Sequence, residues 1–148
     1  MKIVQATRDH IDDLVPLFDG YRIFYKQESD FNGVKKFLSA RIQNNESIIY
    51  LAFINDKAVG FTQLYPLFSS VSIKPMYLLN DLFVDQSIRG KGVGEALIEA
   101  AKDLCRNENN KGMAIQTTPD NPAQNLYQRL GFIKDVDLQF FWMNDKSS

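Results

Sequence analysis

A short glycine-rich stretch is the part of the chain whose residue types and spacing imply chemistry most directly. Gly90, Gly92 and Gly94 follow the apolar run Leu82–Val84 and lead into the amphipathic run Glu95–Cys105. Glycine leaves room for backbone N–H groups to crowd around an anion, and the start of a helix adds the positive end of its dipole. The pattern therefore predicts a phosphate-binding loop and a nucleotide-like ligand.

Two common nucleotide-binding loops do not fit this stretch. A dinucleotide-binding loop follows the first strand of a βαβ unit, and an acidic residue comes about 20 residues later. Here the glycines follow the fourth predicted strand, and the segment from Lys111 onward supplies no such acid. A Walker loop ends in Gly-Lys-Ser/Thr, whereas Gly90-Lys91-Gly92 lacks the hydroxyl that would hold magnesium. Both of these folds are therefore disfavoured.

Two motifs, taken together, point to one known family. Residues 89–94 read arginine-x-x-glycine-x-glycine and follow Leu82–Val84. Residues 121–127, Asn-Pro-Ala-Gln-Asn-Leu-Tyr, come later and are followed by Leu130–Phe132. A glycine-rich hexapeptide alone often arises as a turn or a helix cap, but the order and spacing of both motifs are more specific. The chain resembles the GNAT superfamily of acyl-CoA N-acyltransferases over essentially its whole length.

This resemblance implies that the chain binds acetyl-CoA as an acetyl donor. The backbone amides from Arg89 to Gly94 would cradle the pyrophosphate, and the strand edge at Leu82 and Val84 would pair with the pantetheine amides like an added strand. Family members commonly have a bulge on this strand, although nothing in the sequence reveals it directly. The implied cofactor contacts are Leu82, Phe83, Val84, Arg89, Gly90, Lys91, Gly92, Val93, Gly94, Asn121, Ala123, Asn125 and Tyr127.

The reaction implied by the resemblance is direct attack of a neutral amine on the acetyl thioester. The amine must lose a proton and the departing thiolate must gain one, so two proton-handling groups are needed. Tyr127 matches the family's usual acid, because a phenol with a pKa of about 10 stays protonated at neutral pH; packing is its alternative role. Asp81 is the candidate base. A chain of water molecules could replace it, which would leave Asp81 a structural hydrogen-bonding residue.

Residues 21–28 and Tyr65 resemble the acceptor-side region of histone- and polyamine-like members of the superfamily, and Asp81 is a candidate acceptor-binding residue as well as a base. Tyr21, Tyr25 and Tyr65 are candidate acceptor-binding residues, because aromatic rings can hold an ammonium group by cation–π contact. Ordinary core packing is their alternative role. A small-molecule amine is the first choice of acceptor, and a protein lysine or N-terminus is the second. A non-catalytic CoA-binding module is the third hypothesis, and the presence of Tyr127 favours the enzyme over it.

Hydrophobic periodicity predicts the elements that position these residues. Strands are predicted over Lys2–Thr7, Ile48–Ile54, Ala58–Leu67, Met76–Val84, Lys111–Thr118 and Phe132–Met143, the last of them turned at Asp135–Asp137. Helices are predicted over Asp9–Tyr25, Asp30–Gln43, Val93–Asn107 and Asn121–Leu130. Residues 55–57 predict a hairpin turn, and Pro66 predicts a strand end or a bulge. The order β-α-α-β-β-β-α-β-α-β-β predicts an α/β (α+β) fold with a mixed, mostly antiparallel sheet flanked by helices, which resembles the GNAT fold.

Composition narrows the possible partners. The 148 residues, 45% of them hydrophobic, fit one domain, predicted over residues 1–144 with a short polar tail over 145–148. A net charge of −1 gives no electrostatic reason to expect nucleic acid or an anionic membrane as a partner. One cysteine and one histidine, without an acidic cluster at ligand spacing, make a metal site unexpected. The N-terminus lacks the apolar stretch of a signal peptide, which predicts a cytoplasmic location.

The last predicted strand carries more apolar surface than one sheet face needs. Phe140, Phe141, Trp142 and Met143 place large apolar groups on both of its faces. A homodimer contact there is one explanation, and cover by a helix of the same chain is the other.

Overall fold

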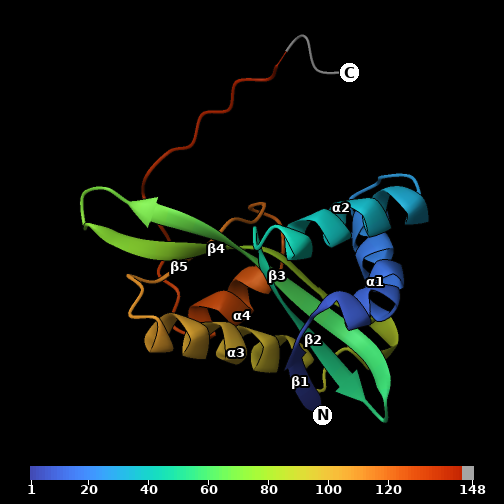
Figure 1. Cartoon of the computed structure of the whole chain (residues 1–148). Coiled ribbons are helices and arrows are strands. Elements are labelled where there is room, and N and C mark those ends of the chain that lie inside the picture. Colours follow the sequence, from blue (N-terminus) through green and yellow to red (C-terminus); the bar gives the residue numbers. More distant parts are fainter. Residues whose placement is uncertain (145–148) are drawn as a thin grey trace. The chain divides into compact units, whose positions relative to one another are not determined.

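The computed structural model describes residues 1–144, and its contacts divide them into two compact units (Figure 1). The first unit is Met1–Gln116, and the second begins at Thr117. The first holds a five-stranded sheet with three α-helices, and the second holds one α-helix.

The sheet of the first unit is mixed and mostly antiparallel, as predicted. Its strands are β1 (Lys2–Gln5), β2 (Ile48–Ile54), β3 (Lys57–Ser69), β4 (Lys74–Val84) and β5 (Met113–Ile115). They lie in the order β1-β2-β3-β4-β5, with antiparallel pairing from β1 to β4 and parallel pairing of β4 with β5. Short turns join β2 to β3 and β3 to β4, whereas longer helical connections join β1 to β2 and β4 to β5.

The β2–β3 hairpin turns where the sequence predicts it. Asn55 and Asp56 have φ angles of 51° and 62°, the left-handed conformation that a tight two-residue hairpin turn requires. Pro66, however, does not end β3 or mark its bulge, because it lies within the strand opposite Tyr77. The β2 pairing of β3 stops at Leu64, so a residue without an N–H is tolerated where β3 has one partner strand only.

Three longer helices belong to the first unit: α1 (Ile11–Phe24), α2 (Phe31–Gln43) and α3 (Val93–Asn107). A short 3-10 helix, η1 (Arg8–His10), leads into α1 and is capped by Thr7, whose hydroxyl accepts from the Asp9 N–H. Asp30 caps α2, because its carboxylate accepts from the Gly33 N–H at 2.9 Å. The predicted bounds of α3 are confirmed, and those of α1 and α2 differ by one or two residues.

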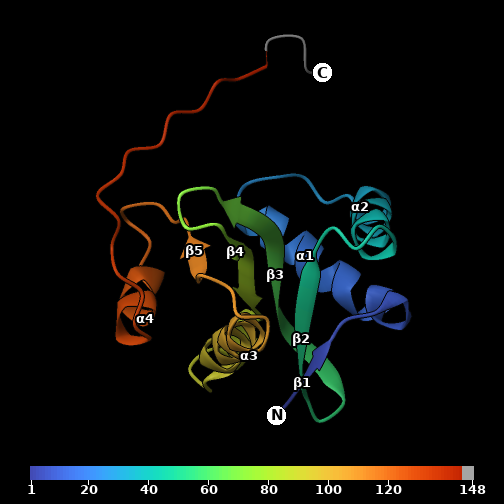
Figure 2. The same ribbon diagram turned by 60° about the vertical axis from the view of Figure 1, so that its left-hand side comes forward.

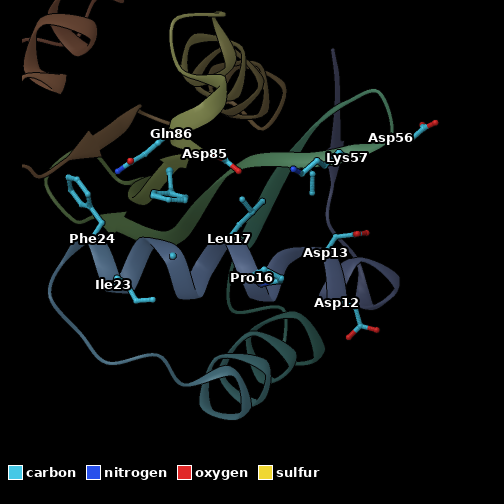
Figure 3. Close-up of a pocket in the computed structure, with 13 residues that line it drawn as sticks. Asp12, Asp13, Pro16, Leu17, Ile23, Phe24, Asp56, Lys57, Asp85 and Gln86 are labelled. Carbon is cyan, nitrogen blue, oxygen red and sulfur yellow. The ribbon is translucent and has the colours of Figure 1, made fainter.

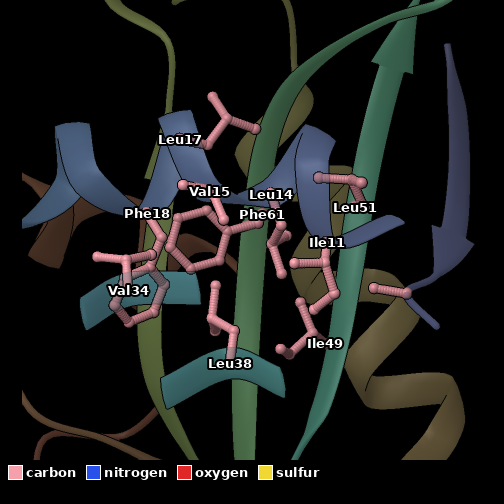
Figure 4. Packing of buried hydrophobic residues seen from close by; sticks show 11 residues of the cluster. Ile11, Leu14, Val15, Leu17, Phe18, Val34, Leu38, Ile49, Leu51 and Phe61 are labelled. Atoms are coloured by element: carbon pink, nitrogen blue, oxygen red, sulfur yellow. The ribbon is translucent and has the colours of Figure 1, made fainter. Parts of the chain in front are cut away.

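The helices cover the two faces of the sheet (Figure 2). On one face α1 and α2 pack against Ile49, Leu51 and Phe61 of the central strands (Figure 4). On the other face Val93 and Leu97 of α3 pack against β2 and β3. Leu14, Leu38 and Leu51 are wholly buried in the first of these clusters, so truncation of one of them to alanine would cost about 2–5 kcal/mol. This rigid layer is the platform that carries the candidate site.

The second unit contains α4 (Ala123–Arg129), close to the predicted helix. Gly131 follows it with a φ of 94°, and its N–H donates to the Gln128 carbonyl at 3.1 Å, which ends the helix as predicted.

The prediction of two strands within Phe132–Met143 is wrong, because the described residues from 132 to 144 form no strand. A strand needs a neighbour to satisfy its backbone, and this segment has no ladder partner in the described chain. Its large apolar side chains are exposed, Ile133 by 93% and Phe140 by 90%. The residue types favour a strand, but pattern alone does not supply the partner.

Candidate active site

A bulge on β4 is the feature around which the site is built. Gln63 of β3 lies opposite Asp81, but the next residue, Leu64, lies opposite Leu79, so Asn80 is an extra residue on β4. The parallel pairing with β5 runs from Tyr77 to Leu79 and goes no further. From Asn80 onward, β4 therefore continues without pairing to β5 in the described chain.

The backbone of β4 beyond the bulge faces two ways. The Asp85 N–H donates to the Val59 carbonyl of β3 at 2.8 Å. Backbone groups alternate in direction along an antiparallel strand. The backbone N–H and C=O groups of Asp81 and Phe83 therefore also point toward β3, while those of Leu82 and Val84 point toward the opposite edge of β4. The Val84 carbonyl accordingly accepts from Arg89 Nε at 3.4 Å instead of pairing with a strand. This edge is suited to an extended ligand.

The loop after β4 presents backbone amides. A 3-10 turn, η2 (Gln86–Ile88), leads to Gly90 and Gly92, whose φ angles are 84° and 77°. A Cβ at either glycine would meet nothing within 4 Å, so the left-handed backbone, rather than crowding by the protein, requires glycine. Gly92 is the N-cap of α3 and has no side chain to cap it, and the first amides of a helix have no intrahelical acceptor. The arrangement can bind an anion.

Side chains at the start of the loop are held in place. Asp85 accepts hydrogen bonds from the backbone N–H and the hydroxyl of Ser87, at 3.0 and 2.9 Å. These two bonds lower the pKa of Asp85, which is therefore ionised at neutral pH. The Arg89 guanidinium lies over the Phe24 ring of α1, 5.9 Å from its centroid. Gly60 of β3 lets β3 and β4 pack closely, because a Cβ at this position would be 2.9 Å from the Phe83 carbonyl oxygen.

Asp81, the predicted base, is buried at the bulge. Only 5% of it is exposed, and both of its carboxylate oxygens accept from amides: Oδ2 from Gln63 Nε2 at 2.7 Å, and Oδ1 from Asn80 Nδ2 at 3.1 Å. Its backbone carbonyl accepts from the Thr62 hydroxyl at 2.8 Å. Sequence reasoning missed Gln63, although a glutamine inside an apolar strand was a visible signal.

Two of the three predicted acceptor-side tyrosines reach the bulge. The Tyr21 hydroxyl of α1 donates to the Asn80 carbonyl at 3.4 Å. Burial, and then the charge of Asp81, raise the pKa of Tyr65 to about 12, so its phenol keeps its proton at neutral pH. Tyr25 packs against Tyr21, with the centroids of the two rings 5.1 Å apart. The bulge thus brings together Asp81, a peptide carbonyl and aromatic surface.

The predicted acid lies in the other unit. Tyr127 belongs to α4, where its carbonyl accepts from the Phe132 N–H at 3.0 Å and its ring is 6.1 Å from that of Phe132. Asn121, at the approach to this helix, accepts from the Ala123 N–H at 2.9 Å. The relation of Tyr127, Asn121, Ala123 and Asn125 to the loop over residues 89–94 stays a prediction.

A cavity of about 690 Å³ runs along α1 beside the end of β4 (Figure 3). One face of α1, the β2–β3 turn and the end of β4 line it. Of the predicted site residues only Phe83 lines it, so it is separate from the bulge and from the glycines. Its carboxylates, Asp12, Asp13, Asp56 and Asp85, outnumber Lys57, which disfavours it as a place for a phosphate.

Among the described residues, no group of histidine, cysteine and acidic side chains is arranged to hold a metal ion. In the same residues, none of the helices combines the length and the apolar character of a membrane span.

Comparison with known proteins decides the family. A family model described as Acetyltransferase (GNAT) family matches residues 12–132. The chain belongs to this family. The predicted recognition, fold class and enzyme class are confirmed: the protein has the GNAT fold and is an N-acetyltransferase, and GNAT acetyltransferases use acetyl-CoA.

Relatives of this GNAT protein span nearly its whole length. An uncharacterized N-acetyltransferase of Bacillus subtilis, YhfO, is 44% identical over 145 residues, 97% of each chain. A streptothricin acetyltransferase of Escherichia coli is 31% identical, over 92% of this chain and 73% of the relative. The crystal structure of a probable acetyltransferase, 39% identical, superposes with a TM-score of 0.92 and covers 100% of both chains.

Proposed function

We propose that this GNAT protein transfers the acetyl group of acetyl-CoA to a primary amine of a small molecule, by direct attack within a ternary complex. One observation carries the proposal: the β4 edge at Leu82 and Val84 is released from β5 after the bulge and leads into the amide donors of residues 89–94. A pantetheine arm would pair with that edge as an added strand, and the loop amides would hold the pyrophosphate.

Asp81 is the base in this proposal, and Tyr127 is the acid. The carboxylate of Asp81, directly or through a water molecule, takes a proton from the acceptor ammonium. The neutral nitrogen then attacks the thioester carbonyl, a C–N bond forms and the C–S bond breaks. The departing thiolate takes the phenol proton of Tyr127, and the attacking nitrogen loses its second proton to solvent, which leaves an amide and free CoA. Asp81 passes the proton that it accepted to solvent. The phenolate regains its proton from solvent.

A small amine is favoured over a protein as the acceptor. The streptothricin acetyltransferase is named for a small molecule, and its similarity covers 92% of this chain. Tyr21 donates a hydrogen bond to the Asn80 carbonyl, and burial and the charge of Asp81 raise the pKa of Tyr65. The rings of both residues supply surface on which an ammonium-bearing group can lie.

The cofactor site can be tested with a pair of variants that differ in charge alone. Gly92→Asn and Gly92→Asp have the same shape, and both residues tolerate a positive φ and cap helices well. Calorimetry should show acetyl-CoA binding to the wild type and to Gly92→Asn. In Gly92→Asp we expect binding weaker by on the order of 100-fold, because the new carboxylate repels the pyrophosphate. Equal affinities for the two variants would contradict a phosphate site at this loop.

The acceptor is then found by measuring thiol release from acetyl-CoA. The panel should hold a streptothricin, an aminoglycoside, a polyamine, free amino acids and peptides with lysine or a free N-terminus. Turnover with the small amines supports the proposal, whereas turnover with peptides alone would assign a protein acceptor. Acetyl-CoA binding without turnover on any amine would favour the non-catalytic CoA-binding module.

A homodimer is proposed through the C-terminal segment. Val136, Leu138, Phe140 and Trp142 alternate with other residues and are each at least 75% exposed, which is typical of a strand that lacks its partner. A second copy of the chain is the occupant, and it would bury this apolar row. Light scattering at micromolar protein should give the dimer mass, and a monomer mass would reject the contact. The cytoplasmic location stays a prediction.

A further inference from the structure

Gln63 and Asp81 form a cross-strand pair directly beside the bulge. They lie opposite each other on β3 and β4, on the sheet face that also carries Phe61 and Phe83 under α1. The carboxylate oxygens of Asp81 can only accept when ionised, so the amide of Gln63 must turn its Nε2 toward them. The 2.7 Å bond therefore fixes the orientation of the whole Gln63 side chain.

That orientation leaves the other end of the amide unsatisfied. Gln63 is wholly buried, and its Oε1 has no hydrogen-bond partner in the described structure. A buried unpaired acceptor destabilises the fold. A methionine would fill a similar volume without this penalty. Packing therefore does not explain a glutamine at this position, and its bond to Asp81 does.

The groups around the pair make Asp81 the proton acceptor. Asn80 of β4 donates to Oδ1, and the Tyr21 hydroxyl of α1 donates to the Asn80 carbonyl. Tyr65 of β3 has a pKa of about 12 and stays neutral. Burial and the charge of Asp81 raise this pKa, and the charge of Arg41 on α2 lowers it. None of these neighbours competes with the carboxylate for a proton near neutral pH.

We propose that Gln63 is a positioning residue, which orients the carboxylate of Asp81 at the bulge so that it can accept the proton of the acceptor amine. The inference rests on the proposed function for its catalytic consequence. A hydrogen bond donated to a carboxylate favours its charged form, and loss of that bond disfavours it. Gln63 acts through Asp81 and does not itself need to contact the substrate.

The variants are Gln63→Met, which removes the amide, and Gln63→Glu, which keeps its size but places a second carboxyl beside Asp81. Thr62→Val is the matched control, because Thr62 is also wholly buried on β3 but bonds to the backbone of Asp81. Two readouts are needed. Carbon-13 NMR follows the titration of the Asp81 carboxyl, and the pH profile of kcat/KM is taken with the amine that the panel identifies.

In Gln63→Met the midpoint of the Asp81 titration should rise, because the carboxylate loses a hydrogen-bond donor. The acid limb of kcat/KM should move with it. On the plateau near pH 7, kcat should fall about tenfold because the carboxylate is no longer oriented, while acetyl-CoA affinity is kept. Gln63→Glu should raise the midpoint further, because two adjacent carboxyl groups share a proton. Thr62→Val should lower Tm and leave the midpoint in place.

An unchanged midpoint in folded Gln63→Met or Gln63→Glu would overturn the inference. A shift of equal size in Thr62→Val would also overturn it, because a general loosening of the strand would then be the cause. The two proposals fail separately. A wild type that acetylates no amine defeats the proposed function, while the NMR titration still decides whether Gln63 acts on the carboxylate of Asp81.

Discussion

At the bulge the polar groups of this protein are buried side chains, whereas in the loop after β4 they are backbone amides at exposed residues. Gln63 and Asp81 are at most 5% exposed and are held by short amide–carboxylate bonds. Arg89 to Gly92 are exposed, and their arrangement depends on two positive φ angles. Buried, paired groups keep one geometry, which suits chemistry, and exposed amides at a helix start suit the capture of an anion. Changes at the bulge should therefore alter turnover, and changes in the loop should alter affinity.

Asp81→Asn tests this division with the largest expected effect. The amide cannot take a proton from the acceptor, and loss of a general base typically costs about 10²–10⁴ in rate. Acetyl-CoA affinity measured by calorimetry should stay within about twofold of the wild type, because the loop is untouched. Near-normal kcat/KM would remove Asp81 from the chemistry and favour the water chain.

Deletion of Asn80 separates the bulge from the residues beside it. Leu79 already lies opposite Leu64, and Asp81 opposite Gln63, so the deletion joins two segments that are both in register. The fold should survive, with Tm changed by a few degrees at most. Turnover should fall on the order of 100-fold, because a displacement of about 1 Å at a reacting group has that effect.

The control for this deletion is the same deletion in the Asp81→Asn background. If the bulge acts by placing Asp81, the second change should add little to the first. Fully multiplicative losses would show that the bulge has a separate role, such as opening the edge at Leu82 and Val84 for the pantetheine.

The same contrast explains what the sequence could predict. Helix and strand bounds such as Ile48–Ile54 and Val93–Asn107 follow from local periodicity, and the glycine loop follows from residues that must adopt positive φ. The Asn80 bulge is a property of register between two strands and leaves no signature in either one. The Gln63–Asp81 bond is hidden for the same reason, since 18 residues separate its partners. The strands predicted over Phe132–Met143 were wrong because strand propensity does not specify a partner.

Tyr65→Phe should give the smallest effect and sharpen the electrostatic picture of the bulge. Burial raises the pKa of Tyr65 from 10.0 to about 12 in the folded protein. The unfolded chain releases this proton near pH 10, so the contribution of Tyr65 to stability is complete below pH 10 and is lost as pH rises toward 12. Tyr77 also has a raised pKa, owing to burial and its hydrogen bond to Glu108, so the wild type loses stability in this range from both residues.

The measurement is urea unfolding of the wild type and Tyr65→Phe at pH 8.5, 10 and 11. The variant should lose less stability than the wild type between pH 8.5 and 11, and Tyr77 cancels in that comparison. At pH 7, kcat should change little, because a neutral phenol that keeps its proton is not the base. Parallel stability curves would mean that the pKa of Tyr65 is not raised in the folded protein. A large loss of kcat would mean that its hydroxyl contacts the acceptor, and would extend the chemistry from the bulge to the neighbouring residues of β3.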